Sequence, residues 1–290
     1  MAILLLVLAA VQVVPAEKRV TLKVEATTWR EGKRPFDVAG DFTGKLARAK
    51  VKVVPEGEAA DGRIVVRLEE TEGRSYRSSE EAPEVSGTQI ECSMEFFIGT
   101  GATPALAWKV EADLGGMVLG DLYENAVRIF EALPEVELVG THVAVLLGVK
   151  GAAASLVPAL LDPRTLDHTA DFLEKAGYKP ADARERACFK IARGEFEACG
   201  AEGKEAVEPL LTFFGAAESF EKEGAARALG KLADARAVPA LVAELRGQYD
   251  SLGDVAPAVL CEALEAIGDP AALPDLDELA QRKPVAPDDP

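Results

Sequence analysis

Ala228-Leu229-Gly230-Lys231-Leu232-Ala233-Asp234-Ala235-Arg236-Ala237-Val238-Pro239-Ala240-Leu241 recurs 35 residues later as Ala263-Leu264-Glu265-Ala266-Ile267-Gly268-Asp269-Pro270-Ala271-Ala272-Leu273-Pro274-Asp275-Leu276. In the two stretches the apolar positions coincide, and so do one Asp and one Pro. The apolar residues follow the period of a helix. A repeat of this length is typical of proteins built from stacked helical hairpins.

Two further copies of the helix start precede this pair, at Ala206-Val207-Glu208-Pro209-Leu210-Leu211 and, more weakly, at Leu156-Val157-Pro158-Ala159-Leu160-Leu161. Each Pro falls in the first helical turn, where its missing N–H costs no hydrogen bond. Asp234 and Asp269 stand where they can cap the next helix. A single helix cannot bury its apolar stripe, so we expect successive hairpins to stack and share one core.

These residues resemble HEAT repeats of the short, phycobilisome-lyase-like type. The resemblance is carried by Val207 to Pro239: a Val-x-Pro-Leu-Leu start, an Ala-Leu-Gly helix end, and Asp-x-Arg-Ala-Val-Pro. It extends more loosely over residues 158–279, with a variant segment between Leu166 and Leu211. It implies that residues 117–280 form an α-solenoid of HEAT-type helical hairpins.

Residues 17–116 have a different pattern, in which apolar and polar residues alternate as in half-buried strands. Five candidate strands carry it, around Val20–Val24, Val51–Val53, Ile64–Leu68, Ile90–Phe96 and Trp108–Val110. We therefore predict a small antiparallel β-sandwich or barrel, which gives a multidomain chain of β followed by all-α structure.

Three features between these strands are interpreted as local structure. The polar stretch from Glu69 to Gly87 predicts a solvated loop. The basic cluster Lys45, Arg48, Lys50 and Lys52 is interpreted as the solvated face of a strand, and Gly99-Thr100-Gly101 as a turn.

The two ends of the sequence predict segments outside both domains. Residues 1–16 are short and apolar, with Val14 and Ala16 at the small positions of a cleavage site, so we expect a signal peptide and an exported protein, periplasmic or secreted. Because no Lys or Arg precedes Lys18, a buried first strand is the alternative. The Pro- and Asp-rich residues 281–290 predict a disordered tail.

Charge is concentrated in the second half of the chain. From Met117 to Pro290, 17 Lys and Arg stand against 31 Asp and Glu, a net charge of −14, whereas residues 17–116 carry −3. Such a field repels phosphate backbones, so we expect no nucleic-acid partner. No second apolar run is long enough to span a bilayer, so no stable membrane span is expected in the mature chain.

Residue types that carry chemistry are sparse. Cys92, Cys188, Cys199 and Cys261 have no zinc-site spacing; buried thiols are the first expectation, and a Cys188–Cys199 disulfide is the alternative. The only histidines are His142, interpreted as a core residue, and His168, interpreted as a surface or inter-repeat residue; nothing in the sequence pairs them.

No known catalytic motif is present. The cluster Glu195, Glu197 and Glu202 is interpreted as a solvated acidic loop. We predict no cofactor, no metal and no catalytic residues.

The repeats therefore favour an exported, non-catalytic interaction or scaffold protein that binds another protein through the solenoid surface. Its candidate binding groove comprises the exposed positions on the second helix of each hairpin, namely Asp171, Glu174, Glu223, Arg227, Glu262 and Glu265. One alternative, implied by the resemblance, is a bilin-lyase-like enzyme that attaches or removes a chromophore. Another is a carbohydrate- or surface-binding module on a helical spacer.

Overall fold

The computed structural model describes residues 17–77, 85–112, 122–250 and 255–281. Contacts within the chain define two compact units. The sheet unit comprises residues 1–131 and 146–149, and the helical unit comprises residues 132–145 and 150–290. The predicted signal peptide, most of the predicted tail and the predicted boundary at residues 116 and 117 lie outside the described residues.

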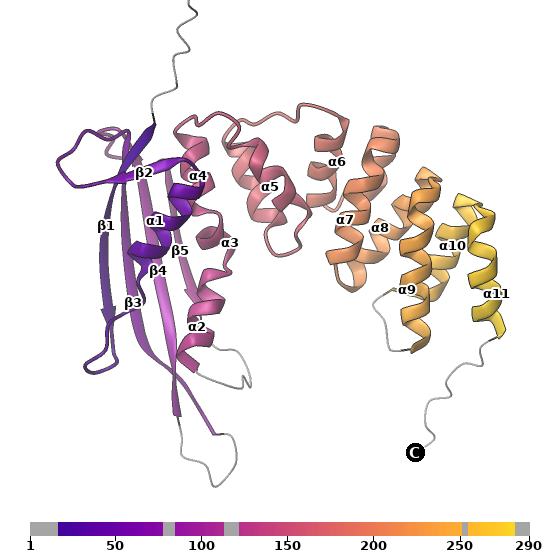
Figure 1. The fold of residues 1–290 in the computed structure, drawn as a ribbon, viewed down its shortest axis with the longest axis horizontal. Coiled ribbons are helices and arrows are strands. Elements are labelled where there is room, and N and C mark those ends of the chain that lie inside the picture. The colour runs from indigo at the N-terminus through magenta and orange to yellow at the C-terminus, as the bar shows by residue number, and fades with distance from the viewer. Residues whose placement is uncertain (1–16, 78–84, 113–121, 251–254, 282–290) are drawn as a thin grey trace, which may run out of the picture. The chain divides into compact units, whose positions relative to one another are not determined.

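The sheet unit contains one five-stranded sheet with the order β2-β1-β3-β4-β5 (Figure 1). Every predicted strand position lies in one of its strands, and the predicted turn follows β4. The strands are β1 (Lys18–Thr28), β2 (Val51–Val54), β3 (Gly62–Tyr76), β4 (Val85–Ile98) and β5 (Leu106–Ala112).

The sheet is mixed, so the predicted antiparallel sandwich or barrel is wrong in this respect. Strand β1 runs parallel to both β2 and β3, and only the β3–β4 and β4–β5 pairs are antiparallel. Parallel strands need a crossover, which helix α1 (Val38–Arg48) provides between β1 and β2. Lys45 and Arg48 therefore lie on a helix and not on the predicted strand face, and Lys45 is buried with its ammonium 2.6 Å from Asp41.

The predicted loop from Glu69 to Gly87 is also shorter than expected. Strands β3 and β4 continue into it, pairing Glu72 with Thr88 and, after a shift in register, Ser75 with Ser86. Polar residues extend the strands here because the hairpin satisfies the backbone hydrogen bonds, which sequence polarity does not report. Residues 78–84 lie outside the described part.

The core of the sheet unit lies on one face of the sheet. Ile64, Val66 and Leu68 of β3 and the alternate residues of β4 are fully buried. Helix α1 contributes Phe42, and α2 (Leu122–Glu131), which packs on β4 and β5, contributes Phe130. The opposite face carries cross-strand ion pairs between exposed or half-exposed side chains, such as those of Arg67 with Glu95 and Lys109 with Glu91.

A buried carboxylate connects α2 to the same sheet. The side chain of Glu70 is fully buried and accepts hydrogen bonds from the Phe36 N–H at 2.7 Å, the Tyr123 hydroxyl at 2.9 Å and the Arg30 guanidinium at 3.3 Å. Arg30 also lies over the Tyr123 ring, 3.4 Å from its centroid. Burial and the Glu70 hydrogen bond raise the pKa of Tyr123 to about 12.

The helical unit contains α-helices and 3-10 helices. Its elements, including α4 at its boundary with the sheet unit, are α3 (Pro134–Glu137), α4 (Val139–Leu146), η1 (Ala154–Leu161), α5 (Leu166–Lys175), α6 (Ala183–Ala192), η2 (Phe196–Ala206), α7 (Val207–Ala216), α8 (Ser219–Leu232), η3 (Ala235–Ala237), α9 (Val238–Asp250), α10 (Pro257–Ile267), η4 (Pro270–Ala272) and α11 (Leu273–Gln281).

The repeat identified in the sequence has the expected local structure. Asp234 and Asp269 each accept a backbone N–H two residues on, from Arg236 and Ala271, and so begin the turns before α9 and α11. The helices pack with neighbours in the next repeat, α8 on α10 and α9 on α11. At the first of these contacts a Cβ built on Gly230 would lie 2.8 Å from the Ala263 Cα, so the glycine permits the close approach.

No described helix combines the length and apolar character needed to cross a bilayer.

Candidate protein-binding surface

The six predicted groove residues lie on three helices: Asp171 and Glu174 on α5, Glu223 and Arg227 on α8, and Glu262 and Glu265 on α10. All are exposed except Glu223, which is half-buried. The helical period places these six residues on the outer face of each helix, because the buried residues occupy the opposite face.

Arg193, which the sequence analysis did not select, joins two of them. It follows the end of α6, and its guanidinium lies 2.8 Å from the Asp171 carboxylate and 2.9 Å from that of Glu174. This ion pair holds the pKa of Asp171 below its ordinary value. The sequence contained one indication of this residue: an Arg followed by Gly194 is typical of a helix end. In the structure Gly194 has a positive φ of 69°, which ends the helix there.

Glu223 and Arg227 form a second, local group. Their side chains are 3.5 Å apart, one helical turn from each other, and Glu223 also accepts the Ala256 N–H before α10 at 3.3 Å. Glu223 thus contributes to the packing of α10 as well as to the surface.

An open pocket of about 400 Å³, which we call the aromatic pocket, lies between Arg193 and α8. Phe196, Phe213 and Phe220 line it together with Arg193, Glu223 and Arg227. A Cβ on Gly224 would lie 2.5 Å from the Phe196 ring, so this glycine admits the ring against α8. The structure therefore brings Glu223 and Arg227 to one pocket and places Asp171 and Glu174 at its edge through Arg193.

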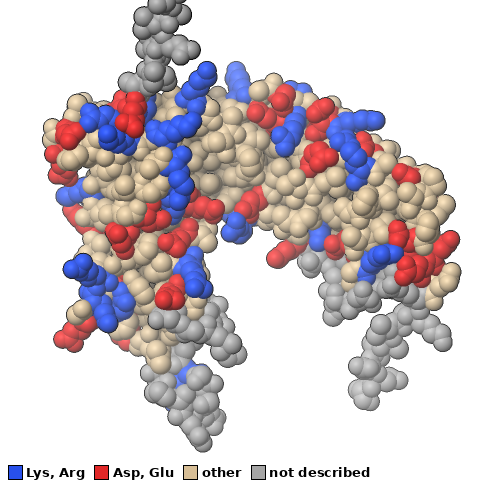
Figure 2. Space-filling model, in the orientation of Figure 1, with Lys and Arg blue, Asp and Glu red and all other residues tan. Residues whose placement is uncertain are grey.

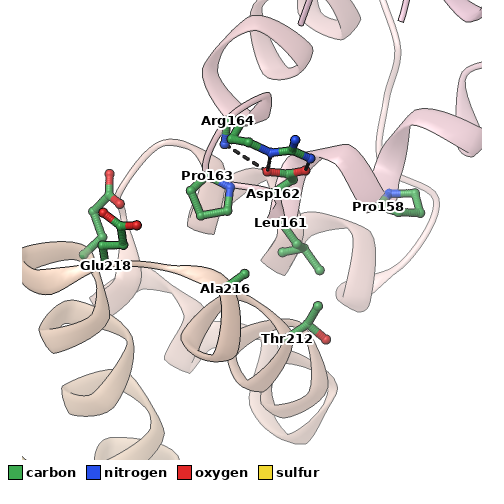
Figure 3. A pocket seen from close by; sticks show the side chains of 9 residues that line it. Pro158, Leu161, Asp162, Pro163, Arg164, Thr212, Ala216 and Glu218 are labelled. Carbon is green, nitrogen blue, oxygen red and sulfur yellow. Dashed lines mark hydrogen bonds and ion pairs between the residues drawn. The ribbon is translucent and has the colours of Figure 1, made fainter. Parts of the chain in front are cut away.

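A second pocket of about 630 Å³, which we call the proline pocket, lies beside the start of α8. Its walls come from Pro158, Leu161 and Pro163 on one side and from Thr212, Ala216 and Glu218 on the other (Figure 3). Asp162 and Arg164 form an ion pair at its rim, with 2.6 Å between guanidinium and carboxylate. The sequence analysis selected none of these residues as a site.

Glu262 and Glu265 line neither pocket. They lie exposed on α10, next to the exposed thiol of Cys261. The structure therefore separates the six predicted residues into a group around the aromatic pocket and a pair on α10.

The two histidines, which nothing in the sequence paired, lie together. Their ring centroids are 5.0 Å apart, and Phe172 packs on His142 with 4.0 Å between ring centroids. His142 is fully buried, as predicted, and burial lowers its pKa to about 3. The His168 Nδ1 lies 3.6 Å from the Glu135 carboxylate. The two rings come from different helices, His142 from α4 and His168 from α5, and sequence spacing does not show that they meet.

The cysteines are all free thiols, so the alternative of a Cys188–Cys199 disulfide is not present. Burial raises the pKa of the Cys188 and Cys199 thiols to about 11, which makes both poor nucleophiles. Within the described residues no three His, Cys, Asp or Glu side chains are arranged to hold a metal ion.

In the acidic cluster after α6, Glu195 and Glu197 are exposed, as predicted, and Glu202 is the shielded member. The Glu202 side chain is 7% exposed and lies 2.7 Å from Lys190 and 2.9 Å from Arg186. Glu197 pairs with Lys231 of α8 at 2.8 Å. Glu202 therefore ties η2 to α6, whereas the Glu197 pair is a solvent-exposed ion pair of small energetic effect.

Charged side chains of both signs are distributed over the face of the molecule drawn in Figure 2, and carboxylates gather around α11. Arg246 of α9 is paired there with Asp275 and Glu278.

Comparison with known proteins gives one match to a family model. Residues 222–247 match the PBS lyase HEAT-like repeat, which confirms over this stretch the resemblance predicted from the sequence. The stretch runs from α8 through the Asp234 turn into α9, and it suggests a helical repeat scaffold. The family model identifies no part of the sheet unit.

No curated protein is significantly similar to the chain in sequence. A solved structure of a neuraminyllactose-binding hemagglutinin homolog from Helicobacter pylori is 14% identical, and the match covers 44% of this chain and 84% of that one with a TM-score of 0.25. This likeness is too low to assign a fold or a function.

Proposed function

We propose that the protein is an exported, non-catalytic scaffold whose helical unit is a HEAT-type α-solenoid that binds another protein. The observation that carries the proposal is the HEAT-like repeat at residues 222–247, which contains the exposed Arg227 of α8 and is followed on α10 by the exposed Glu262 and Glu265. Stacked repeats offer an extended surface, and their ordinary role is to bind other proteins.

The arrangement of charge supports the same surface. Glu223, Arg227 and Arg193 surround an open, partly aromatic pocket, and mixed charge around an aromatic centre is typical of protein interfaces. Export rests on the apolar residues 1–16 alone, and sequencing the N-terminus of protein recovered from its native cells tests it.

The binding proposal is tested by immobilising the full chain and measuring by mass spectrometry which proteins it recovers from its native extract. We expect the double charge reversal Glu223→Lys with Glu262→Lys to reduce recovery of at least one protein about tenfold, because interface charges set partner choice. The single variant Glu262→Lys changes only an exposed side chain, so it separates lost binding from local unfolding.

The matched control reverses two exposed carboxylates of the sheet unit, Glu56→Lys with Glu69→Lys. Two results contradict binding through the helical surface: an equal fall in recovery in this control, or no fall in recovery in either double variant.

A further inference from the structure

The most exposed large apolar side chain of the described residues is Phe220, with 85% of its surface accessible. It lies in the first turn of α8 and lines the aromatic pocket. Single exposed apolar residues are common on protein surfaces, but aromatic residues are enriched in interfaces, so the position of this one beside a concave surface suits an anchor for a bound partner.

The two pockets flank this residue. Glu221, the next residue, lines both of them, and Glu218 lines the proline pocket (Figure 3). A ligand that covers Phe220 therefore has room for side chains on either side. This geometry suits an extended peptide better than a small molecule.

The charges around Phe220 are unbalanced. Each arginine of the two pockets is already paired: Arg164 with Asp162, Arg193 with Asp171 and Glu174, and Arg227 with Glu223. The carboxylates of Asp167, Glu218 and Glu221, in contrast, have no ion pair or side-chain hydrogen bond to any residue that the structure describes. The unneutralised charge of the surface is negative, so its complement is cationic.

We propose that the surface formed by Phe220 and its two flanking pockets binds a segment of a partner protein in which an apolar side chain lies next to Lys or Arg. The apolar side chain packs on Phe220 and beside the half-buried Phe196, and the cations meet Asp167, Glu218 and Glu221. This inference rests on the proposed function, since it names the partner chemistry and the part of the helical unit that recognises it.

Fluorescence anisotropy with the full chain and two labelled decapeptides tests the proposal. One peptide is Gly-Lys-Leu-Phe-Lys-Lys-Leu-Phe-Lys-Gly, and the other has Glu at every Lys position. We expect the Lys peptide to bind at least about tenfold more tightly at low salt, and added salt to weaken it. Phe220→Ser and the double variant Glu218→Gln with Glu221→Gln are each expected to weaken the Lys peptide about tenfold.

Two matched controls lie on α11, which lines neither pocket. Leu273→Ser removes another exposed apolar side chain, 57% accessible, and Asp277→Asn removes another exposed carboxylate. Both are expected to leave binding unchanged. Equal affinity for the two peptides, or equal losses in the α11 controls, overturns the proposal.

Two other outcomes also overturn it. If Glu218 and Glu221 serve only to stabilise the start of α8, their substitution lowers the stability of the protein and leaves its affinity for the peptide unchanged. A second copy on Phe220 would appear in sedimentation as a dimer that Phe220→Ser dissociates. If Glu262→Lys reduces partner recovery and Phe220→Ser does not, this inference alone is wrong. If neither substitution reduces recovery, the proposed function is wrong as well.

Discussion

At the scale of single residues, the sheet unit contains a buried hydrogen-bond network centred on Glu70. Glu70 is satisfied by three donors from the loop before α1 and from α2, namely Phe36, Arg30 and Tyr123. Such a network stabilises a fold only while every member is present, because a partner left alone keeps its desolvation cost.

We predict that Glu70→Ala lowers the free energy of unfolding of the sheet unit by about 3–5 kcal/mol, because it leaves Arg30 charged and largely buried. Both tryptophans of the chain, Trp29 and Trp108, lie in this unit, so their fluorescence in urea reports it selectively. Glu69→Ala, on the exposed face of the same strand, is the control and should change stability by less than about 0.5 kcal/mol. Equal effects of the two substitutions would refute the network.

The buried His142 makes the helical unit sensitive to acid. Its pKa falls from 6.5 to about 3 in the folded chain, so the unfolded chain binds a proton first as the pH drops. The contribution of the neutral, buried ring to the free energy of unfolding is fully present above pH 6.5. It is lost as the pH falls from 6.5 to 3, by up to about 1.4 kcal/mol per pH unit.

We therefore predict that helical circular dichroism in urea shows steadily lower stability from pH 7 to pH 5, and that His142→Leu makes this slope shallower by about one proton. His168, whose pKa is also lowered by burial, keeps part of the slope in the variant. Identical slopes for the wild type and the variant would show that His142 titrates normally.

At the scale of elements, helices α8 and α10 pack closely on each other at Gly230 and Ala263. Ala is the better helix former, so Gly230→Ala in isolation would gain about 1 kcal/mol. Its Cβ would meet the Ala263 backbone at 2.8 Å, however, and backbone cannot move aside as a side chain can.

We predict that Gly230→Ala destabilises the helical unit by about 1–3 kcal/mol. Gly247→Ala in α9, where a Cβ meets nothing within 4 Å, should stabilise it by about 0.5–1 kcal/mol. Urea unfolding followed by circular dichroism measures both. If both variants gain stability, α8 and α10 are not in close contact.

The sequence predicted elements better than their arrangement. Alternation located all five strands, and the 35-residue repeat located α8 to α11. Helix α1 was missed because its buried Lys45 breaks the apolar stripe of Val38, Phe42 and Leu46. Parallel pairing was missed because it depends on that crossover.

The candidate site was predicted only in part, for a similar reason. Exposure on α8 follows from helical period, so Glu223 and Arg227 were found. Phe220 was not, because an aromatic residue in a helical stripe is normally core, and its exposure depends on where α8 begins. The pockets join residues from η1 to α8, and such long-range contacts are absent from local patterns.

At the scale of the whole molecule, the account depends on how the helices share their core. In a solenoid each repeat contacts only its neighbours, so loss of one end is felt locally. In a single globular core, loss of the same helices would destabilise every helix of the unit.

Hydrogen exchange of the chain ending at Asp250, compared with the full chain, decides between these two arrangements. The solenoid predicts that amides of α8 and α9, which lose their contacts with α10 and α11, exchange at least about tenfold faster, while α5 and α6 keep their protection. Loss of protection in all helices from α5 onward, or no change in α8, would contradict it.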